Sequence, residues 1–265
     1  MSHRTPTDEA HASSSPIVLL TAGGSLAWIV INSLRKRLGA ITVIEEVSET
    51  KAEIFRRRVR LVGWWHALGQ VAFGLTERVF LRNRSRLASI WSRHGLDRRP
   101  NPEVTVHRVS SVNAPECRLL LERLRPKVVA VYGTRILKKA TLQCIDAPFI
   151  NYHAGINPKY RGQHPGYWAL ASGDAENAGV TIHLVDEGVD TGSVLYQARV
   201  AFEPNDTIAT YQHVQAATAL PLFQRAIEDA LAGRLHPKAV DLPSQQFLPP
   251  TLWAYLGNGL MRGVW

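Results

Sequence analysis

The start of the chain limits its fold more than any other feature of the sequence. Ile17–Thr21 is a short apolar run followed by a Gly-rich turn at 22–25, and Leu26–Leu38 has helical character up to Gly39. Ala40–Val47 then has the composition of a second strand. A strand, a glycine turn, a helix and a strand in this order are typical of a parallel sheet with helices on both faces. We therefore expect an α/β fold with a Rossmann-like, open, mainly parallel sheet.

Later segments extend this expected sheet. Val128–Tyr132 and Phe149–His153 have the composition of buried strands, and Val180–Val185 and Ser193–Val200 that of extended segments joined by a Gly-containing turn. The pattern of apolar residues thus predicts strands in the middle of the chain.

Helix signals lie between and after these strands. The four residues from Asn113 resemble a capping box with Asn113 as the cap, and the helix that follows should end before Pro126. Asp206 is placed to cap a long helix, which Pro221 should kink and Gly233 should end.

Composition narrows the class of protein. A chain of 265 residues with 45% hydrophobic residues can bury a core without disulfides or metals. Cys117 and Cys144 fit neither a disulfide framework nor a zinc site by spacing, so we expect no metal and a cytoplasmic location. No segment has the ~20 consecutive apolar residues that a membrane span requires. The net charge of +9 favours anionic partners.

Three polar residues are candidates for catalysis. Asn151 and His153 are two apart at the end of an apolar run, so in a strand they share a face, and Asp190 follows a neighbouring extended segment. An amide and an imidazole can donate hydrogen bonds to the oxygen that becomes charged in acyl transfer to an amine. A carboxylate would favour the imidazolium and help to move the proton of the amine. The pattern alone leaves equally open that His153 is a surface histidine and Asn151 a turn residue.

Three blocks in order, Asn151–Gly162, Gly179–His183 and Asp186–Gly192, resemble the 10-formyltetrahydrofolate-dependent formyltransferases. That family includes glycinamide ribonucleotide transformylase, methionyl-tRNA formyltransferase and the sugar N-formyltransferases. The similarity is strongest between about residues 128 and 200. It implies transfer of a formyl group from 10-formyltetrahydrofolate to a primary amine. The residues that it implies are listed by role: Asn151, His153 and Asp190 for catalysis, Arg135, Ile136 and Leu137 lining the folate pocket, and Asp186, Glu187, Gly188 and Val189 covering the pterin.

The resemblance also sets the expected domains. Residues 1–15 would be a disordered leader, 16–235 the formyltransferase catalytic domain with a helical insert at about 48–96, and 236–265 a C-terminal appendage wrapped on the domain. The residues after Gly233 are too few for the C-terminal barrel of the methionyl-tRNA enzymes, so we expect no tRNA-binding domain.

Departures from the family bear on the amine that is formylated. Gly23, Gly24 and Ser25 match the phosphate-binding turn of the purine enzymes without its Asn, and either an anion site or a plain turn fits them. Ala216 stands where those enzymes have a Glu for the ribose. The run from Lys159 through Arg161 to Gly162 and the following Trp168 resemble the sugar enzymes and make Arg161 a substrate-binding candidate. We therefore expect an amino sugar linked to a nucleotide or a lipid, with glycinamide ribonucleotide transformylase or 10-formyltetrahydrofolate hydrolase as alternatives.

The insert has two interpretations. Arginines flank the apolar, tryptophan-containing segment Leu61–Leu75. Its apolar side could pack on the domain and cap the substrate pocket, or the segment 56–86 could rest on anionic lipid as a peripheral membrane contact. The first is favoured, since an apolar stripe is more often part of a core. The sequence leaves the oligomeric state open.

Overall fold

The computed structural model of the chain describes residues 15–80 and 83–265. Within these residues, seven strands form one sheet in the order β3-β2-β1-β4-β5-β7-β8. Their bounds are β1 (Ile17–Thr21), β2 (Thr42–Glu46), β3 (Thr105–Val109), β4 (Val128–Tyr132), β5 (Phe149–His153), β7 (Gly179–Leu184) and β8 (Val194–Arg199). β1 to β5 are parallel to one another, whereas β5 and β7, and β7 and β8, pair antiparallel. The expected Rossmann-like, mainly parallel sheet is confirmed.

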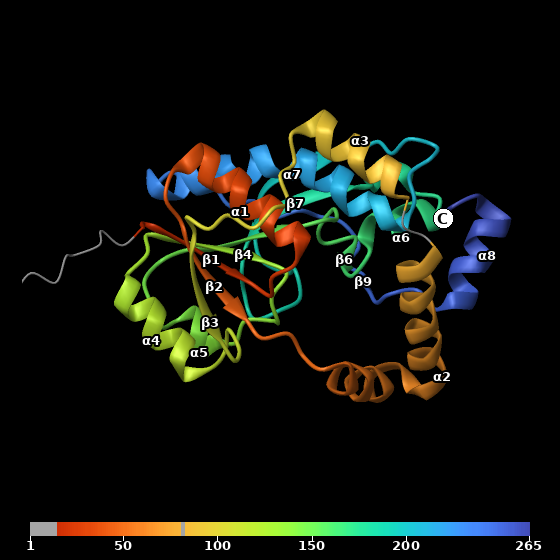
Figure 1. Cartoon of the computed structure of the whole chain (residues 1–265), viewed down its shortest axis with the longest axis horizontal. Coiled ribbons are helices and arrows are strands. Elements are labelled where there is room, and N and C mark those ends of the chain that lie inside the picture. The colour runs from red at the N-terminus through yellow and green to blue at the C-terminus, as the bar shows by residue number, and fades with distance from the viewer. Residues whose placement is uncertain (1–14, 81–82) are drawn as a thin grey trace, which may run out of the picture.

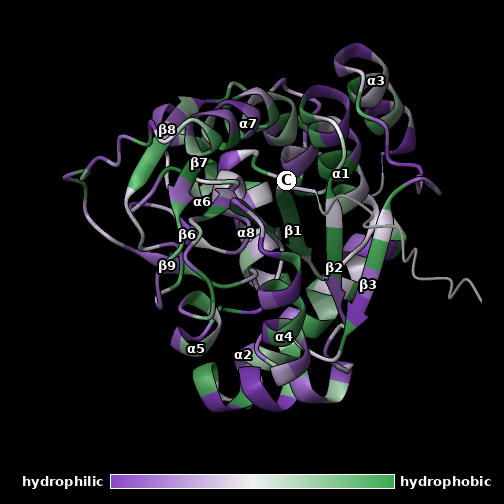
Figure 2. Ribbon diagram, turned by 90° about the vertical axis from the view of Figure 1, so that its left-hand side faces the viewer, coloured by the Kyte–Doolittle hydropathy of each residue, from purple (hydrophilic) through white to green (hydrophobic). Residues whose placement is uncertain are grey.

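Helices cover both faces of the sheet (Figure 1). On one face lie α1 (Ser25–Leu38), α3 (Arg84–His94) and α7 (Ile208–Leu231), and on the other α4 (Pro115–Leu124) and α5 (Lys139–Leu142). β1 shows why: all of its residues are buried, with Ile17 and Leu19 in the cluster of α1 and α7, and Val18 and Leu20 in the cluster of α4. The central strand β1 is hydrophobic along most of its length (Figure 2), as a strand buried on both faces must be.

The remaining elements lie beyond the carboxyl ends of the parallel strands. They are α2 (Lys51–Phe80), β6 (Arg161–Gly162), α6 (Pro165–Ala171), the 3₁₀ helix η1 (Ala175–Asn177), β9 (Gln246–Phe247) and α8 (Leu252–Arg262). β6 and β9 pair with each other, and α2 and α8 lie side by side at one end of the molecule (Figure 1). No helix in the described part of the chain is long and apolar enough to cross a membrane.

α2 fills most of the expected insert, and local signals set its shape. It begins at a capping box in which the Glu53 carboxylate accepts from the Thr50 backbone N–H at 2.8 Å. Gly63 has φ 77° and ψ 162°, a backbone conformation open to glycine, and it divides the helix into two halves. The second half packs on α8, where the rings of Trp65 and Trp253 stack 5.0 Å apart.

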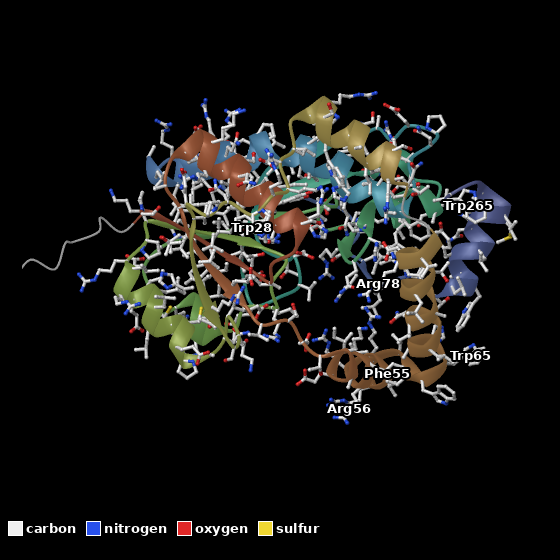
Figure 3. All side chains as sticks on the ribbon, in the orientation of Figure 1. Trp28, Phe55, Arg56, Trp65, Arg78 and Trp265 are labelled. Atoms are coloured by element: carbon white, nitrogen blue, oxygen red, sulfur yellow. The ribbon has the colours of Figure 1, made fainter. Side chains whose placement is uncertain are left out.

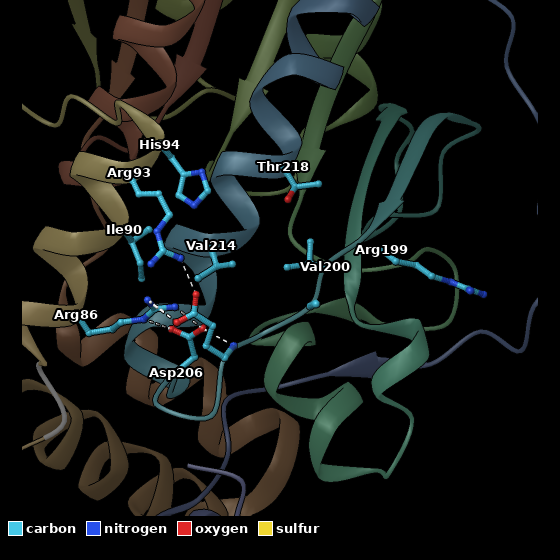
Figure 4. A pocket seen from close by; sticks show the side chains of 11 residues that line it. Arg86, Ile90, Arg93, His94, Arg199, Val200, Asp206, Val214 and Thr218 are labelled. Atoms are coloured by element: carbon cyan, nitrogen blue, oxygen red, sulfur yellow. Dashed lines mark hydrogen bonds and ion pairs between the residues drawn. The ribbon is translucent and has the colours of Figure 1, made fainter.

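A buried ion pair docks α3 on the start of α7. The Arg86 guanidinium donates to both Asp206 oxygens at 2.8 and 2.9 Å, as drawn in Figure 4. Asp206 also accepts from the backbone N–H of Glu203 and from the Thr210 hydroxyl. Fixed geometry and these further donors are what allow a charged pair to be buried.

Two expected helix caps were wrong. α4 is preceded by Ala114, and the carboxamide of Asn113 instead donates to the Ile136 carbonyl and accepts from the Lys138 N–H. α7 begins after Thr207, because Asp206 is engaged by Arg86.

Of the other expected helix ends, one agrees with the structure and one differs from it by two residues. α4 ends before Pro126, as expected. α7 is one helix through Pro221, and its last residue, Leu231, lies two before Gly233. Ser15 is buried beside β1, and residues 1–14 of the expected leader lie outside the described part of the chain.

Candidate active site

β5 directs Asn151 and His153 to the same face of the sheet. Ile150 and Tyr152 point to the opposite face, where they pack in the cluster of α7. Phe149 shares the side of Asn151 and packs in the cluster of α4. The alternation of a strand therefore places both candidate polar side chains as the sequence predicted.

Asp190 reaches this face by a route that the sequence did not predict. β7 is antiparallel to β5, so it ends beside the start of β5, where the Val185 N–H donates to the Phe149 carbonyl at 2.8 Å. The loop after β7 then folds back. A side chain at Gly192 would meet the Leu184 carbonyl oxygen at 1.7 Å, so this approach requires glycine.

The structure brings the three candidates together as an Asn–His–Asp cluster. The Asp190 Oδ2 atom lies 3.3 Å from His153 Nδ1, and its Oδ1 atom lies 3.4 Å from Asn151 Nδ2. The Gly162 backbone N–H donates to Asp190 Oδ2 at 3.0 Å and ties the carboxylate to β6.

A fourth residue, His183, belongs to this site and was not among the predicted catalytic residues. Its Nε2 atom is 3.1 Å from Asn151 Nδ2 and 3.6 Å from Asp190 Oδ1, while its Nδ1 atom faces the Leu184 carbonyl at 2.7 Å. An Nδ1–H tautomer donates to Leu184 and accepts from Asn151. His183 lies opposite Asn151 in the antiparallel register, so only the direction of β7 reveals it.

The cluster perturbs the ionisation of its members. Burial raises the pKa of Asp190, but the charge of His153, the neighbouring His183 ring and the hydrogen bond from the Gly162 N–H outweigh it and hold that pKa well below the usual range. Burial lowers the pKa of His153, and the Asp190 carboxylate and the Tyr160 carbonyl oppose this without restoring the ordinary value. His153 Nε2 is 2.8 Å from the Tyr160 carbonyl, so both ring nitrogens face acceptors and the imidazolium alone satisfies both.

The candidate folate-lining residues after β4 differ in how open they are. Leu137 is 2% exposed and packs below the face to which Asn151 points, whereas Ile136 is 55% exposed. The Arg135 guanidinium is held by Glu46 at 2.8 Å and by the Val47 carbonyl. Ile136 is therefore the side chain of the three that offers an open apolar surface.

Hydrogen bonds from within the loop and from Arg161 hold the candidate pterin loop in place. Glu187 and Gly188 are exposed, and Asp186 accepts from the Gly188 N–H at 3.1 Å. Arg161, predicted to bind substrate, donates to the Val189 carbonyl at 2.7 Å. In this structure Arg161 thus supports the loop that carries Asp190.

The glycine turn after β1 lies apart from the cluster. Gly23 and Gly24 have positive φ, Ser25 is the exposed first residue of α1, and Glu45 of β2 lies against Gly23. β1 is two strands from β5, about 10 Å at ordinary strand spacing. The turn shares the carboxyl edge with the cluster without joining it.

Aromatic stacking ties the C-terminal segment to the site, which the sequence did not predict. Phe247 of β9 stacks between Tyr160 at 5.4 Å and Trp168 at 5.3 Å, and the Trp168 Nε1–H donates to the Leu248 carbonyl. Trp168 therefore holds residues that are distant in the sequence against β6.

Known proteins resemble this chain in sequence and in fold. The methionyl-tRNA formyltransferase of Trichlorobacter lovleyi is 31% identical over 150 residues, 56% of this chain and 47% of that protein. The chain spans less than half the length of the curated relatives that it matches. A 4-N formyltransferase from Francisella tularensis superposes with a TM-score of 0.54 at 15% identity, over 93% of this chain and 80% of that one. Phosphoribosylglycinamide formyltransferase from Streptococcus pneumoniae superposes with a TM-score of 0.51 at 19% identity, over 81% and 98%.

These superpositions establish the fold. The model of one family, described as formyl transferase, matches residues 84–227, more than half of the chain and all of β3 to β8. The matched segment contains the whole Asn–His–Asp cluster and His183. On this match, the chain belongs to the formyl transferase family.

Proposed function

We propose that this chain transfers a formyl group from 10-formyltetrahydrofolate to a primary amine, with the Asn–His–Asp cluster as its catalytic centre. The observation that carries the proposal is the convergence of Asn151, His153 and Asp190, with the carboxylate within 3.4 Å of both partners. Membership of the formyl transferase family supports it.

The cluster can stabilise the charge that develops when an amine attacks a formyl carbonyl. Asn151 directs its amide hydrogens at His183 and Asp190, and a formyl oxygen would compete for one of them. His153 as imidazolium is the second donor once that oxygen replaces the Tyr160 carbonyl at Nε2. Asp190, ionised at neutral pH, supports the imidazolium and helps to pass the proton of the amine to the leaving nitrogen.

The surroundings fit a folate donor, which would supply the activated formyl group. Ile136 is a branched aliphatic side chain, more than half exposed beside the well-packed Leu137, and a flat heterocycle can cover such a surface. The exposed loop Asp186–Val189 lies next to the carboxylate and presents backbone polar groups. These residues would hold the donor with its formyl group toward Asn151.

For the acceptor we propose an amino sugar linked to a nucleotide or a lipid. Ala216 is fully buried against the sheet, so its position offers no open contact for a ribose. The turn at Gly23–Ser25 lacks the Asn of the purine enzymes. α2 follows β2 at the carboxyl edge and adds bulk beyond a minimal catalytic domain. These features favour an acceptor other than glycinamide ribonucleotide.

Release of tetrahydrofolate from 10-formyltetrahydrofolate, measured by absorbance, tests both the proposed formyl transfer and the proposed acceptor. We expect release to require an amine and to be faster with a nucleotide-linked amino sugar than with glycinamide ribonucleotide. Equal release without any amine would make the protein a hydrolase. Efficient formylation of glycinamide ribonucleotide would overturn the acceptor and leave the formyl transfer intact.

A further inference from the structure

Exposed apolar side chains gather on two neighbouring helices. Of the sixteen large hydrophobic residues exposed in the described chain, seven lie on α2 and four on α8. They are Leu61, Trp64, Trp65, Leu68, Val71, Leu75 and Val79 on α2, and Trp253, Leu256, Leu260 and Met261 on α8. We call these eleven side chains the α2–α8 surface. Concentration of this kind marks a binding surface, whereas isolated exposed apolar residues are ordinary.

The side chains on α2 form a continuous stripe. Trp64, Leu68, Val71, Leu75 and Val79 recur every three or four residues, so they share one side of the second half of the helix. Phe73 lies about 200° around the helix from Leu75 and is buried against His164 and Tyr255. The second half of the helix therefore has one apolar side that is buried against the protein and a second apolar side that is exposed.

α8 has an exposed apolar side of its own. Trp253, Leu256 and Leu260 recur on its outer side, while Tyr255 and Gly259 are buried. The stacked rings of Trp65 and Trp253 join the two helices.

The charge beside this surface is positive. α2 has six basic residues, four of them between Arg56 and Arg60, against the acidic Glu53 and Glu77, and α8 has none that is acidic. Arg56 and Arg60 are exposed, and Arg56 extends away from the sheet in Figure 3. Tryptophan and aliphatic side chains flanked by arginine are the composition of helices that lie in the interface of an anionic bilayer.

We propose that the α2–α8 surface docks this protein on an anionic lipid bilayer, with the apolar stripe in the interface and the arginines against the headgroups. The helices lie on the membrane and do not cross it. The proposal concerns binding alone and stands apart from the chemistry of the Asn–His–Asp cluster.

Sedimentation with vesicles tests the proposal. The protein should bind vesicles of phosphatidylcholine with phosphatidylglycerol, and should bind phosphatidylcholine alone much more weakly. Arg56→Gln and Arg60→Gln should each weaken binding about fivefold, because a basic residue near an anionic surface contributes about that factor. Binding should also fall as salt is raised.

Three Leu→Glu substitutions distinguish binding through this surface from binding through other parts of the molecule. Leu75→Glu on α2 (58% exposed) and Leu260→Glu on α8 (81%) should each weaken binding at least about tenfold, since either removes a leucine from the interface. Leu119→Glu on α4 (64% exposed, at the far end of the molecule in Figure 1) should bind as the wild type does. Thermal unfolding of each variant shows that it is folded.

Three outcomes would overturn the proposal. One is wild-type protein that does not bind anionic vesicles. Another is an equal loss of binding in Leu119→Glu, which would make the attraction a general charge effect. The third is a wild-type dimer in analytical ultracentrifugation that Leu75→Glu converts to monomer, because a second copy would then cover the surface.

Discussion

The side-chain nitrogens of Asn151 and His153 in the candidate centre each face a neighbouring polar group. His153 faces the Tyr160 carbonyl and the Asp190 carboxylate, and Asn151 faces His183 and Asp190. These contacts hold the donors in place, and a substrate oxygen on which charge develops would replace one of the present acceptors. Tests of single residues at this centre therefore address the proposed chemistry directly.

Loss of one donor should lower turnover while leaving the donor pocket in place. We expect Asn151→Ala or His153→Ala to reduce kcat at least about 100-fold, as removal of one oxyanion donor does elsewhere. Tetrahydrofolate release gives kcat, and fluorescence titration gives folate affinity. His236→Ala changes an exposed histidine outside the cluster and should behave as the wild type. Full activity in either cluster variant would remove that residue from the mechanism.

The role of Asp190 predicts a pH dependence. Its carboxylate raises the pKa of His153 against burial, so Asp190→Asn should lower that pKa further. At low pH His153 is protonated in both proteins, and as pH rises the variant loses its imidazolium first. The ratio of variant to wild-type kcat should therefore fall with rising pH and then become constant. A ratio that does not vary with pH would mean that Asp190 acts otherwise than on His153.

At the scale of elements, contacts between helices use polar groups as well as apolar ones. α3 rests on α7 through the pair of Arg86 and Asp206 and through the Trp91 Nε1–H, which donates to His213 Nδ1 at 3.0 Å. That acceptor exists only while His213 is neutral. The contact between the two helices should therefore weaken in acid.

His213 should make stability depend on pH between about 6.5 and 4. Burial lowers the pKa of His213 to about 4, so in this window the unfolded chain binds more protons than the folded one. The free energy of unfolding therefore decreases as the pH is lowered from 6.5 to 4. One histidine with this shift contributes a loss of about 2 kcal/mol between pH 7 and pH 5.

Urea unfolding at the two pH values measures this loss. His213→Gln keeps an acceptor for Trp91 without a titrating group and should show about 2 kcal/mol less pH dependence than wild type. The His164→Gln variant is the comparison. Burial also lowers the pKa of His164, which lies at the start of α6 against Phe73, to about 4, so this variant should lose a similar part of the pH dependence. An unchanged pH dependence in His213→Gln would contradict the assignment.

At the scale of the whole molecule, the C-terminal segment, distant in sequence, packs against β6 beside the site. β9 pairs with β6, which holds Asp190 through the Gly162 N–H, and Phe247 fills the space between Tyr160 and Trp168. The chain after α7 thus supports the candidate centre although it lies outside the segment matched to the family.

Removing the Phe247 ring should loosen the packing of this segment. We expect Phe247→Ala to cost up to about 3 kcal/mol of folding free energy, the lower end of the range for large aromatic truncations, because the ring is only half-buried. Limited proteolysis should then cleave residues 236–250 faster than in wild type. Leu256→Ala, an exposed change on α8, is the control, and equal cleavage rates in all three proteins would argue against the role of Phe247.

The sequence by itself determined what depends on neighbouring residues. β1, β4 and β5 lie at the residues predicted, because each of them begins in a short apolar run, which marks a buried strand. The shared face of Asn151 and His153 followed from the period of a strand. The resemblance carried by three short blocks located the Asn–His–Asp cluster.

Only the tertiary structure decided what depends on pairing between distant segments. The antiparallel direction of β7 brings His183 to Asn151 and requires the return of the loop at Gly192. Trp168 packs against Phe247, and the second half of α2 has one buried and one exposed apolar side. Apolar periodicity shows that a side chain is suited to burial, but which surface covers it depends on contacts that local sequence does not encode.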